Sequence, residues 1–122
     1  DKQIKYCVIT PYYEEKYYGN MPMVDIVLED DVDMNSFNEL EFINRIINEK
    51  FISNASISSR QIPSRFRFKQ ELPITKNGKV DFVSLKNEDP SNCDVIVDVD
   101  ETNIQIGGIN IYSNKNVKKL IK

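Results

Sequence analysis

The chain has 122 residues, a length that fits one small domain with a single hydrophobic core. Its 40% hydrophobic and 29% charged residues are ordinary for a globular protein. A net charge of −3 and a pI near 5.0 argue against a surface for nucleic acid or anionic membrane, which would need clustered positive charge. No apolar run approaches the ~20 residues of a membrane span. From the charge and from the lack of such a run, we expect no nucleic-acid partner and no membrane partner.

Missing and isolated residue types limit the chemistry further. Histidine is absent, which excludes a histidine-based triad or a histidine-containing zinc site within this chain. Cys7, in an apolar segment, is expected in the core, and Cys93, in a polar stretch, at the surface. No metal site is expected from their spacing, and reduced thiols in a cytoplasmic protein are the default, with a disulfide left open. The chain shows no signal peptide and begins at Asp1 rather than methionine, as expected if the start of a precursor is missing.

The N-terminal part predicts two strands joined by a loop. Residues 4–10 form an apolar segment that we expect as a strand ending at Pro11, and residues 23–28 form a second strand. The tyrosine-rich stretch 12–18 between them is expected to be a packed connector, with a binding surface as the alternative.

A helix and a third strand follow. Ser36 and Glu39 have the spacing of a capping box, which predicts a helix start at Ser36. Apolar residues then recur at helical spacing, so the helix should bury one face and end near Lys50 or Phe51. Residues 65–69 alternate basic and aromatic side chains, a period of two that predicts a half-buried strand rather than a nucleic-acid patch.

The segment 72–81 places one lysine next to a tight turn. Asn77-Gly78 is the strongest short turn signal, because both residues tolerate a positive φ. Lys79 follows directly, and an ammonium on a rigid turn can meet a carboxylate or phosphate reproducibly. A phosphate-binding P-loop is excluded, because Pro73 and Val80 stand where that motif needs glycine and serine or threonine. A short apolar turn, 82–85, is expected next.

Residues 62–81 resemble the motif that ends the small C-terminal subdomain of enzymes in the adenylate-forming superfamily, which holds acyl-CoA synthetases, adenylation domains of peptide synthetases and luciferases. Nearly every element of the pattern V-P-x-x-F-x-F-V-x-x-L-P-x-T-x-N-G-K-V-D is present in order. The resemblance implies that Lys79 is catalytic and binds the reacting carboxylate and the α-phosphate side of ATP during acyl-adenylate formation. It also implies a large N-terminal adenylation domain that holds ATP, Mg²⁺ and the carboxylic acid. CoA, or the phosphopantetheine of a carrier protein, would then be the thiol acceptor.

Residues 97–111 resemble the motif that opens the same C-terminal subdomain. Asp100 or Glu101 takes the position of the acidic hinge, and Gly107 and Gly108 match the glycine strand that approaches pantetheine. Glycine suits such close approach, although an ordinary bulge is the alternative. The segment departs from the family at four positions: Val99, Thr102, Gln105 and Asn110.

The two motifs occur in reversed order. A helix beginning at Asn116 would lead, if Lys122 were joined to Asp1, straight into the first strand. We therefore interpret the chain as one circularly permuted subdomain, 1–122, made of 1–85, a polar linker at 86–92, and 93–122. This interpretation expects Asp1 and Lys122 to lie close together. The alternative is a tandem arrangement in which 93–122 begin a second copy.

The expected fold is α+β: a small mixed β-sheet with two main helices packed on one face. The expected function is the mobile C-terminal subdomain of an ATP-dependent acid–thiol ligase, inactive on its own. Two alternatives stay open: a non-catalytic relative that docks a carrier or another protein, and a small domain whose Asn-Gly-Lys turn is coincidental.

Overall fold

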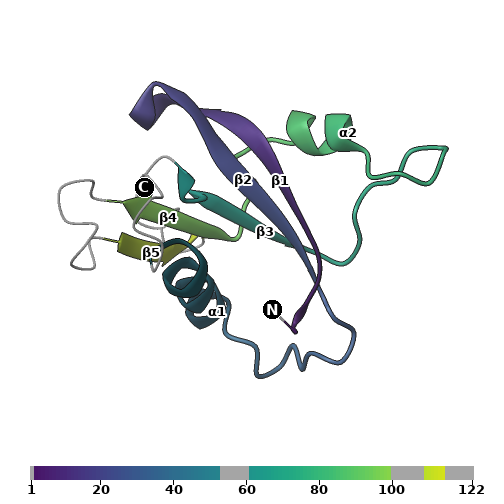
Figure 1. The fold of residues 1–122 in the computed structure, drawn as a ribbon, viewed down its shortest axis with the longest axis horizontal. Helices are drawn as coiled ribbons and strands as arrows, with labels where there is room; N and C mark the ends of the chain where they lie inside the picture. The colour runs from purple at the N-terminus through teal and green to yellow at the C-terminus, as the bar shows by residue number, and fades with distance from the viewer. Residues whose placement is uncertain (1, 53–60, 100–108, 115–122) are drawn as a thin grey trace.

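The computed structural model describes residues 2–52, 61–99 and 109–114, which contain one five-stranded mixed sheet. The strands are β1 (Ile4–Glu14), β2 (Gly19–Leu28), β3 (Arg65–Lys69), β4 (Val95–Val99) and β5 (Ile109–Ser113), and they lie side by side in chain order (Figure 1). Within these strands β2 and β3 are parallel and the other neighbours antiparallel. The described helices are α1 (Glu39–Ile47), continued by a π-helical turn (Asn48–Ile52), and α2 (Phe82–Asn87). The predicted α+β class is confirmed.

The hairpin of β1 and β2 is longer than the sequence predicted, because β1 continues through Pro11. Pro11 lies opposite Pro22, and the Pro22 carbonyl accepts a hydrogen bond from Ser64 N at 3.2 Å. The polar groups of Pro22 therefore face β3, and those of Pro11 face the outer edge of the sheet. A proline at an outer edge removes no ladder hydrogen bond, so the prediction that the strand ends there was wrong.

The tyrosine-rich stretch belongs to this hairpin rather than to a separate connector. Tyr12 is buried in β1, Tyr13 is exposed in the same strand, and a short 3₁₀ turn (Glu15–Tyr17) leads to Tyr18. Tyr18 has a left-handed backbone, with φ of 53°, and its side chain is exposed. Packing was therefore the right interpretation for Tyr12, but not for Tyr13 or Tyr18.

Helix α1 covers one face of the sheet. Its apolar stripe of Phe42, Ile43, Ile46 and Ile47 packs with strand residues Val24, Ile26, Phe66, Val95 and Val97. The N-cap of the helix is Asn38, whose side chain accepts a hydrogen bond from Glu41 N at 3.1 Å. The predicted capping box was wrong, because Ser36 instead donates to the Asp33 carbonyl in the preceding turn.

Helix α2 lies on the opposite face. Arg67 alternates along β3 with Phe66 and Phe68, which face α1, and the Arg67 guanidinium donates to the Leu85 carbonyl of α2. Residues 82–85, which we expected to form an apolar turn, instead form the start of α2. The second helix that we expected, from Asn116, lies outside the described residues, as do both ends of the chain.

The two cysteines are placed in reverse of the prediction. Cys7 is exposed, because β1 is the outer strand of the sheet, whereas Cys93 is buried against Tyr12, Met21 and Met23. Both are free thiols. Neighbouring protein atoms still remove part of the water around the Cys7 sulfur, and this desolvation raises the pKa of the Cys7 thiol above its ordinary value, with the Asp25 carboxylate adding to the effect.

Candidate functional site

The turn that carries Lys79 is a small hairpin closed by backbone hydrogen bonds. Gly78 N donates to Thr75 O at 3.0 Å, Thr75 N donates to Lys79 O at 2.7 Å, and Ile74 forms a β-bridge with Val80. Gly78 has a φ of +80°, the left-handed conformation that favours glycine. The predicted reversal at Asn77-Gly78 is confirmed, with Gly78 alone at positive φ among the two. This arrangement holds the Lys79 backbone on both sides.

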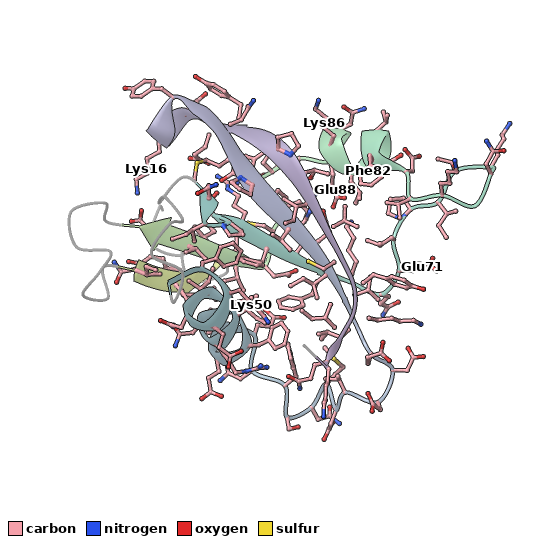
Figure 2. All side chains as sticks on the ribbon, in the orientation of Figure 1. Lys16, Lys50, Glu71, Phe82, Lys86 and Glu88 are labelled. Carbon is pink, nitrogen blue, oxygen red and sulfur yellow. The ribbon has the colours of Figure 1, made fainter. Side chains whose placement is uncertain are left out.

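The Lys79 side chain is exposed, and the segment between β3 and α2 extends away from the sheet (Figure 1). Three large apolar side chains near this turn are also exposed: Ile74, Phe82 and Val83. Phe82 and Lys86 both lie on α2 (Figure 2). A cation bordered by exposed apolar residues can contact an anionic group on a partner while burying apolar surface around it.

Asp81 joins this hairpin to α2. Its backbone N donates to Pro73 O at 2.8 Å, and its carboxylate accepts from Ser84 N at 3.1 Å and from Ser84 Oγ at 2.7 Å. The hydrogen bonds from Ser84 lower the pKa of the Asp81 carboxyl below its ordinary value of 3.8. Asp81 thus stays ionised as the N-cap of α2 and ties the helix start to the hairpin.

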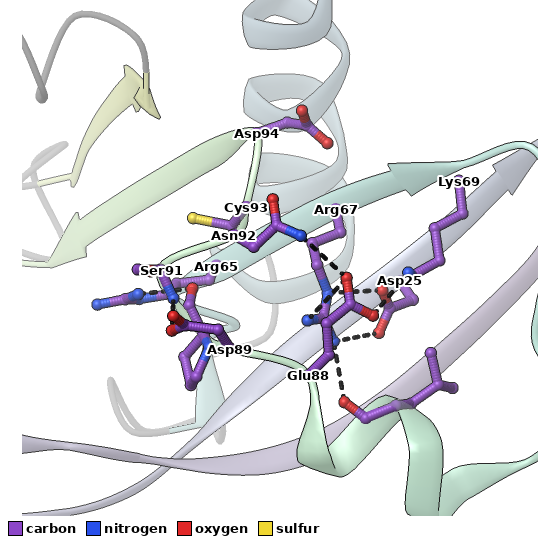
Figure 3. Close-up of polar contacts among 12 residues, drawn as sticks. Asp25, Arg65, Arg67, Lys69, Glu88, Asp89, Ser91, Asn92, Cys93 and Asp94 are labelled. Atoms are coloured by element: carbon purple, nitrogen blue, oxygen red, sulfur yellow. Dashed lines mark hydrogen bonds and ion pairs between the residues drawn. The ribbon is translucent and has the colours of Figure 1, made fainter.

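A buried charged cluster lies under α2 and was missed by the sequence analysis (Figure 3). Arg67 and Asp25, with 3% and 0% exposed side chains, form a bidentate pair, and Glu88 lies beside them. The strand predicted for residues 65–69 is confirmed, but it is not half-buried, because Arg67 is buried on the face opposite Phe66. One signal could have found the pair: Asp25 interrupts the apolar run of β2, and a charge in such a run needs a partner.

A second polar cluster lies at the far end of the hairpin. The Arg65 guanidinium stacks on Tyr12, with 5.1 Å to the ring centroid, and binds Glu14 at 3.0 Å. Tyr12 hydroxyl contacts Ser64 Oγ, and burial raises the pKa of Tyr12 to about 12. Lys16 forms an ion pair with Asp98 of β4. This cluster joins the hairpin to the strand that leads toward the hinge-like segment.

The remaining predicted site residues, Asp100, Glu101, Gly107 and Gly108, lie outside the described residues. Within the part of the chain that the structure describes, no group of three or more cysteine, aspartate and glutamate side chains is placed to hold a metal ion. In the same ranges, no helix has both the length and the apolar character needed to cross a membrane.

Comparison with known proteins finds ligases among the proteins that this chain resembles. The chain is 32% identical over 81 residues to the D-alanine–D-alanyl carrier protein ligase of Streptococcus pyogenes serotype M5 (strain Manfredo), which covers 66% of this chain. The ligases of serotypes M49 and M3 match equally well. The chain spans only 15% of the length of these curated relatives. No protein-family model matches it.

Two solved structures share the fold of most of this chain. The amide bond synthetase McbA from Marinactinospora thermotolerans superimposes with a TM-score of 0.51 and 17% identity, over 69% of this chain and 15% of its own. An acyl-CoA synthetase from Brucella canis gives a TM-score of 0.51 and 13% identity, over 70% of this chain and 14% of its own.

Proposed function

This chain is a relative of the adenylate-forming enzymes that corresponds to a part of them, and from this premise we propose that it is their mobile C-terminal subdomain. The observation that carries the proposal is Lys79, exposed on a turn whose backbone is fixed by Thr75 and by the bridge between Ile74 and Val80. In this function Lys79 is delivered into the active site of a larger adenylation domain, where it assists acyl-adenylate formation.

Lys79 acts in this proposal through charge and orientation rather than proton transfer. In adenylation a carboxylate oxygen bonds to the α-phosphorus of ATP while the bond to the β-phosphate breaks and pyrophosphate leaves, so two negative groups must approach each other. A fixed ammonium between them reduces their repulsion and helps to hold the in-line geometry. ATP, Mg²⁺ and the carboxylic acid are held mainly by the larger domain.

The second half of the proposed cycle uses the other motif. The subdomain rotates about Asp100 or Glu101, which removes Lys79 and brings Gly107 and Gly108 toward the pantetheine of CoA or of a carrier protein. The relation to a D-alanine–D-alanyl carrier protein ligase favours a carrier protein as the thiol acceptor.

The reversed order of the two motifs is explained in this proposal by circular permutation. In support, β4 and β5 are not separate from the Lys79 part of the chain. They continue its sheet, with Arg65 opposite Ile96 and Phe66 opposite Val95. One sheet shared by both segments fits a single permuted subdomain better than the start of a second copy.

A second candidate function is a non-catalytic docking module. Ile74, Phe82 and Val83 favour it, because exposed apolar side chains grouped near one turn suit a protein partner whether or not Lys79 is used. The substituted hinge-like motif points the same way.

The two candidate functions predict different effects of a Lys79 substitution on the two half-reactions of the parent ligase, meaning the complete enzyme that joins this subdomain to its larger adenylation domain. Lys79→Ala should lower carboxylate-dependent ATP–pyrophosphate exchange by about 100-fold, as for loss of one donor at a reacting centre. Transfer from preformed acyl-adenylate to the thiol should be largely spared, since the lysine serves only the first conformation. Lys76→Ala, on the same turn, is the matched control and should leave both steps unchanged. Equal loss of both half-reactions, or no loss of either, would contradict the catalytic proposal.

A further inference from the structure

The cluster formed by buried Asp25 and Arg67 with half-buried Glu88 has no part in the proposed chemistry, yet it contacts the segment that carries Lys79. Arg67 Nε donates to Asp25 Oδ1 at 2.7 Å and Nη2 donates to Asp25 Oδ2 at 2.9 Å. The two parallel bonds fix the plane of the guanidinium against β2. Arg67 then has further nitrogen–hydrogen groups directed toward α2.

These remaining contacts reach the last turn of α2. Arg67 Nη2 also donates to Leu85 O at 3.3 Å, and Nη1 lies 3.6 Å from Glu88 Oε1. The other Glu88 oxygen binds Lys69 Nζ at 2.7 Å. Lys69 is the last residue of β3, so both ends of the segment 70–84 are held by the same group of charges (Figure 3).

The hairpin follows the position of α2 because the two are joined. Asp81 N donates to Pro73 O, which closes the base of the hairpin, and the Asp81 carboxylate caps α2. Leu85 N donates to Asp81 O at 3.3 Å, so the backbone contact continues from the hairpin to the residue that Arg67 binds. A shift of α2 would therefore shift the turn that carries Lys79.

Stability alone gives little reason for a buried charged pair at this place. Burying two charges costs several kcal/mol of desolvation, and a well-packed apolar pair is often equally stable or more stable. What an apolar pair cannot supply is direction, because the guanidinium fork binds oxygens on β2 and α2 at fixed angles.

We propose that Arg67, oriented by Asp25, is a positioning residue for Lys79: it sets the placement of α2 and the hairpin on the sheet through Leu85 and Glu88. The role of that placement in catalysis rests on the proposed function. The mechanical coupling between Arg67 and the hairpin does not.

The coupling can be measured on the whole chain by amide hydrogen exchange. The double variant Asp25→Leu, Arg67→Met removes both charges together and leaves no unpaired buried charge. We expect the hydrogen-bonded amides of Asp81, Leu85 and Glu88 to exchange about tenfold faster, because their local opening becomes easier. Amides of α1 and β2 should keep their protection. Lys86→Met, which removes an exposed charge from the same helix, is the matched control and should change neither set.

A second variant keeps the proposal testable if the double variant does not fold. Glu88→Gln leaves the Asp25–Arg67 pair in place and should speed exchange at Leu85 and Glu88 alone. Unchanged exchange at those amides in a folded variant overturns the proposal, as does an equal increase throughout the sheet.

The parent ligase supplies a separate functional readout. There the double variant should lower kcat for adenylation with little change in KM for ATP, as expected when a group is misplaced rather than a substrate lost. If Lys79→Ala has no effect on adenylation, the proposed function fails, whereas the exchange result stands or falls by itself.

Discussion

At the scale of single residues, Lys79 and Arg67 show how differently two cations of this chain are placed. Arg67 is buried and binds Asp25 and Leu85, whereas the Lys79 side chain is exposed and its backbone alone takes part in the turn. A buried unpaired ammonium would be costly, whereas the exposed ammonium of Lys79 avoids that cost and is accessible, as its proposed role requires. The same exposure means that the fold does not depend on the Lys79 side chain.

Lys79→Ala should therefore leave the free energy of unfolding within about 0.5 kcal/mol of the value for the unchanged chain, as for most surface substitutions. Thermal or urea denaturation of the purified chain measures this. Arg67→Ala is the contrasting variant and should destabilise by about 3–5 kcal/mol, because it leaves Asp25 buried without its partner. Marked unfolding of Lys79→Ala would show instead that the lysine is structural.

At the scale of elements, two residues near the start of α1 competed as its N-cap. Asn38 has the extended backbone of a cap and accepts from Glu41 N, while Ser36 belongs to the turn formed with Asp33. The sequence pattern favoured Ser36 because Glu39 lies three residues later. In the folded chain Glu39 is the first residue of the helix, so it cannot fill the third position of a capping box.

The two possible caps give a paired test. Asn38→Ala should destabilise the chain by about 1 kcal/mol, the usual loss when an N-cap acceptor is removed. Ser36→Ala should change stability by less than about 0.5 kcal/mol, because it removes one exposed hydrogen bond outside the helix. Urea denaturation of both variants, with helical content followed by circular dichroism, compares them directly. A larger loss of stability in Ser36→Ala than in Asn38→Ala would show that Ser36 caps the helix, as the capping-box pattern predicted.

The elements that could be predicted depend on neighbouring residues. The strand 65–69 follows from its alternation and the Asn77-Gly78 turn from its two residue types, and both are confirmed. Pro11, Cys7 and Cys93 were misread because their environment is set by distant strands: the outer position of β1 decides the first two, and packing under the hairpin decides the third. The Asp25–Arg67 pair joins residues 42 apart in the chain, so the local sequence can indicate that Asp25 needs a partner but not which residue supplies it.

At the scale of the whole molecule, the chain matches only 15% of the length of its curated relatives. The described residues form one sheet with α1 on one face and α2 on the other, which is the size of a single small domain. Its sequence contains one candidate catalytic lysine and no recognisable nucleotide-binding loop. The proposed role thus needs a larger partner domain, in the same polypeptide or a separate one.

The purified 122-residue chain should accordingly form no acyl-adenylate by itself. Carboxylate-dependent ATP–pyrophosphate exchange measures this, with D-alanine and fatty acids as trial acids and a complete acyl-CoA synthetase as the positive control. Exchange that depends on added carboxylate and is lost in Lys79→Ala would mean that the chain holds a nucleotide site of its own.

The position of Pro11 has a consequence for how molecules of this chain meet each other. An open sheet edge offers unpaired backbone donors to the edge of a neighbouring molecule, which can lead to aggregation. Beside Pro11, the outer strand also exposes Ile9 and Tyr13, two apolar side chains that would favour such contact. Because the nitrogen of Pro11 faces outward and carries no hydrogen, the row of donors is interrupted at its middle. Pro11→Val should restore that donor and increase concentration-dependent self-association in sedimentation velocity runs. Thr10→Val places the same side chain one residue earlier, where the backbone groups face β2, and should leave the protein as dispersed as before.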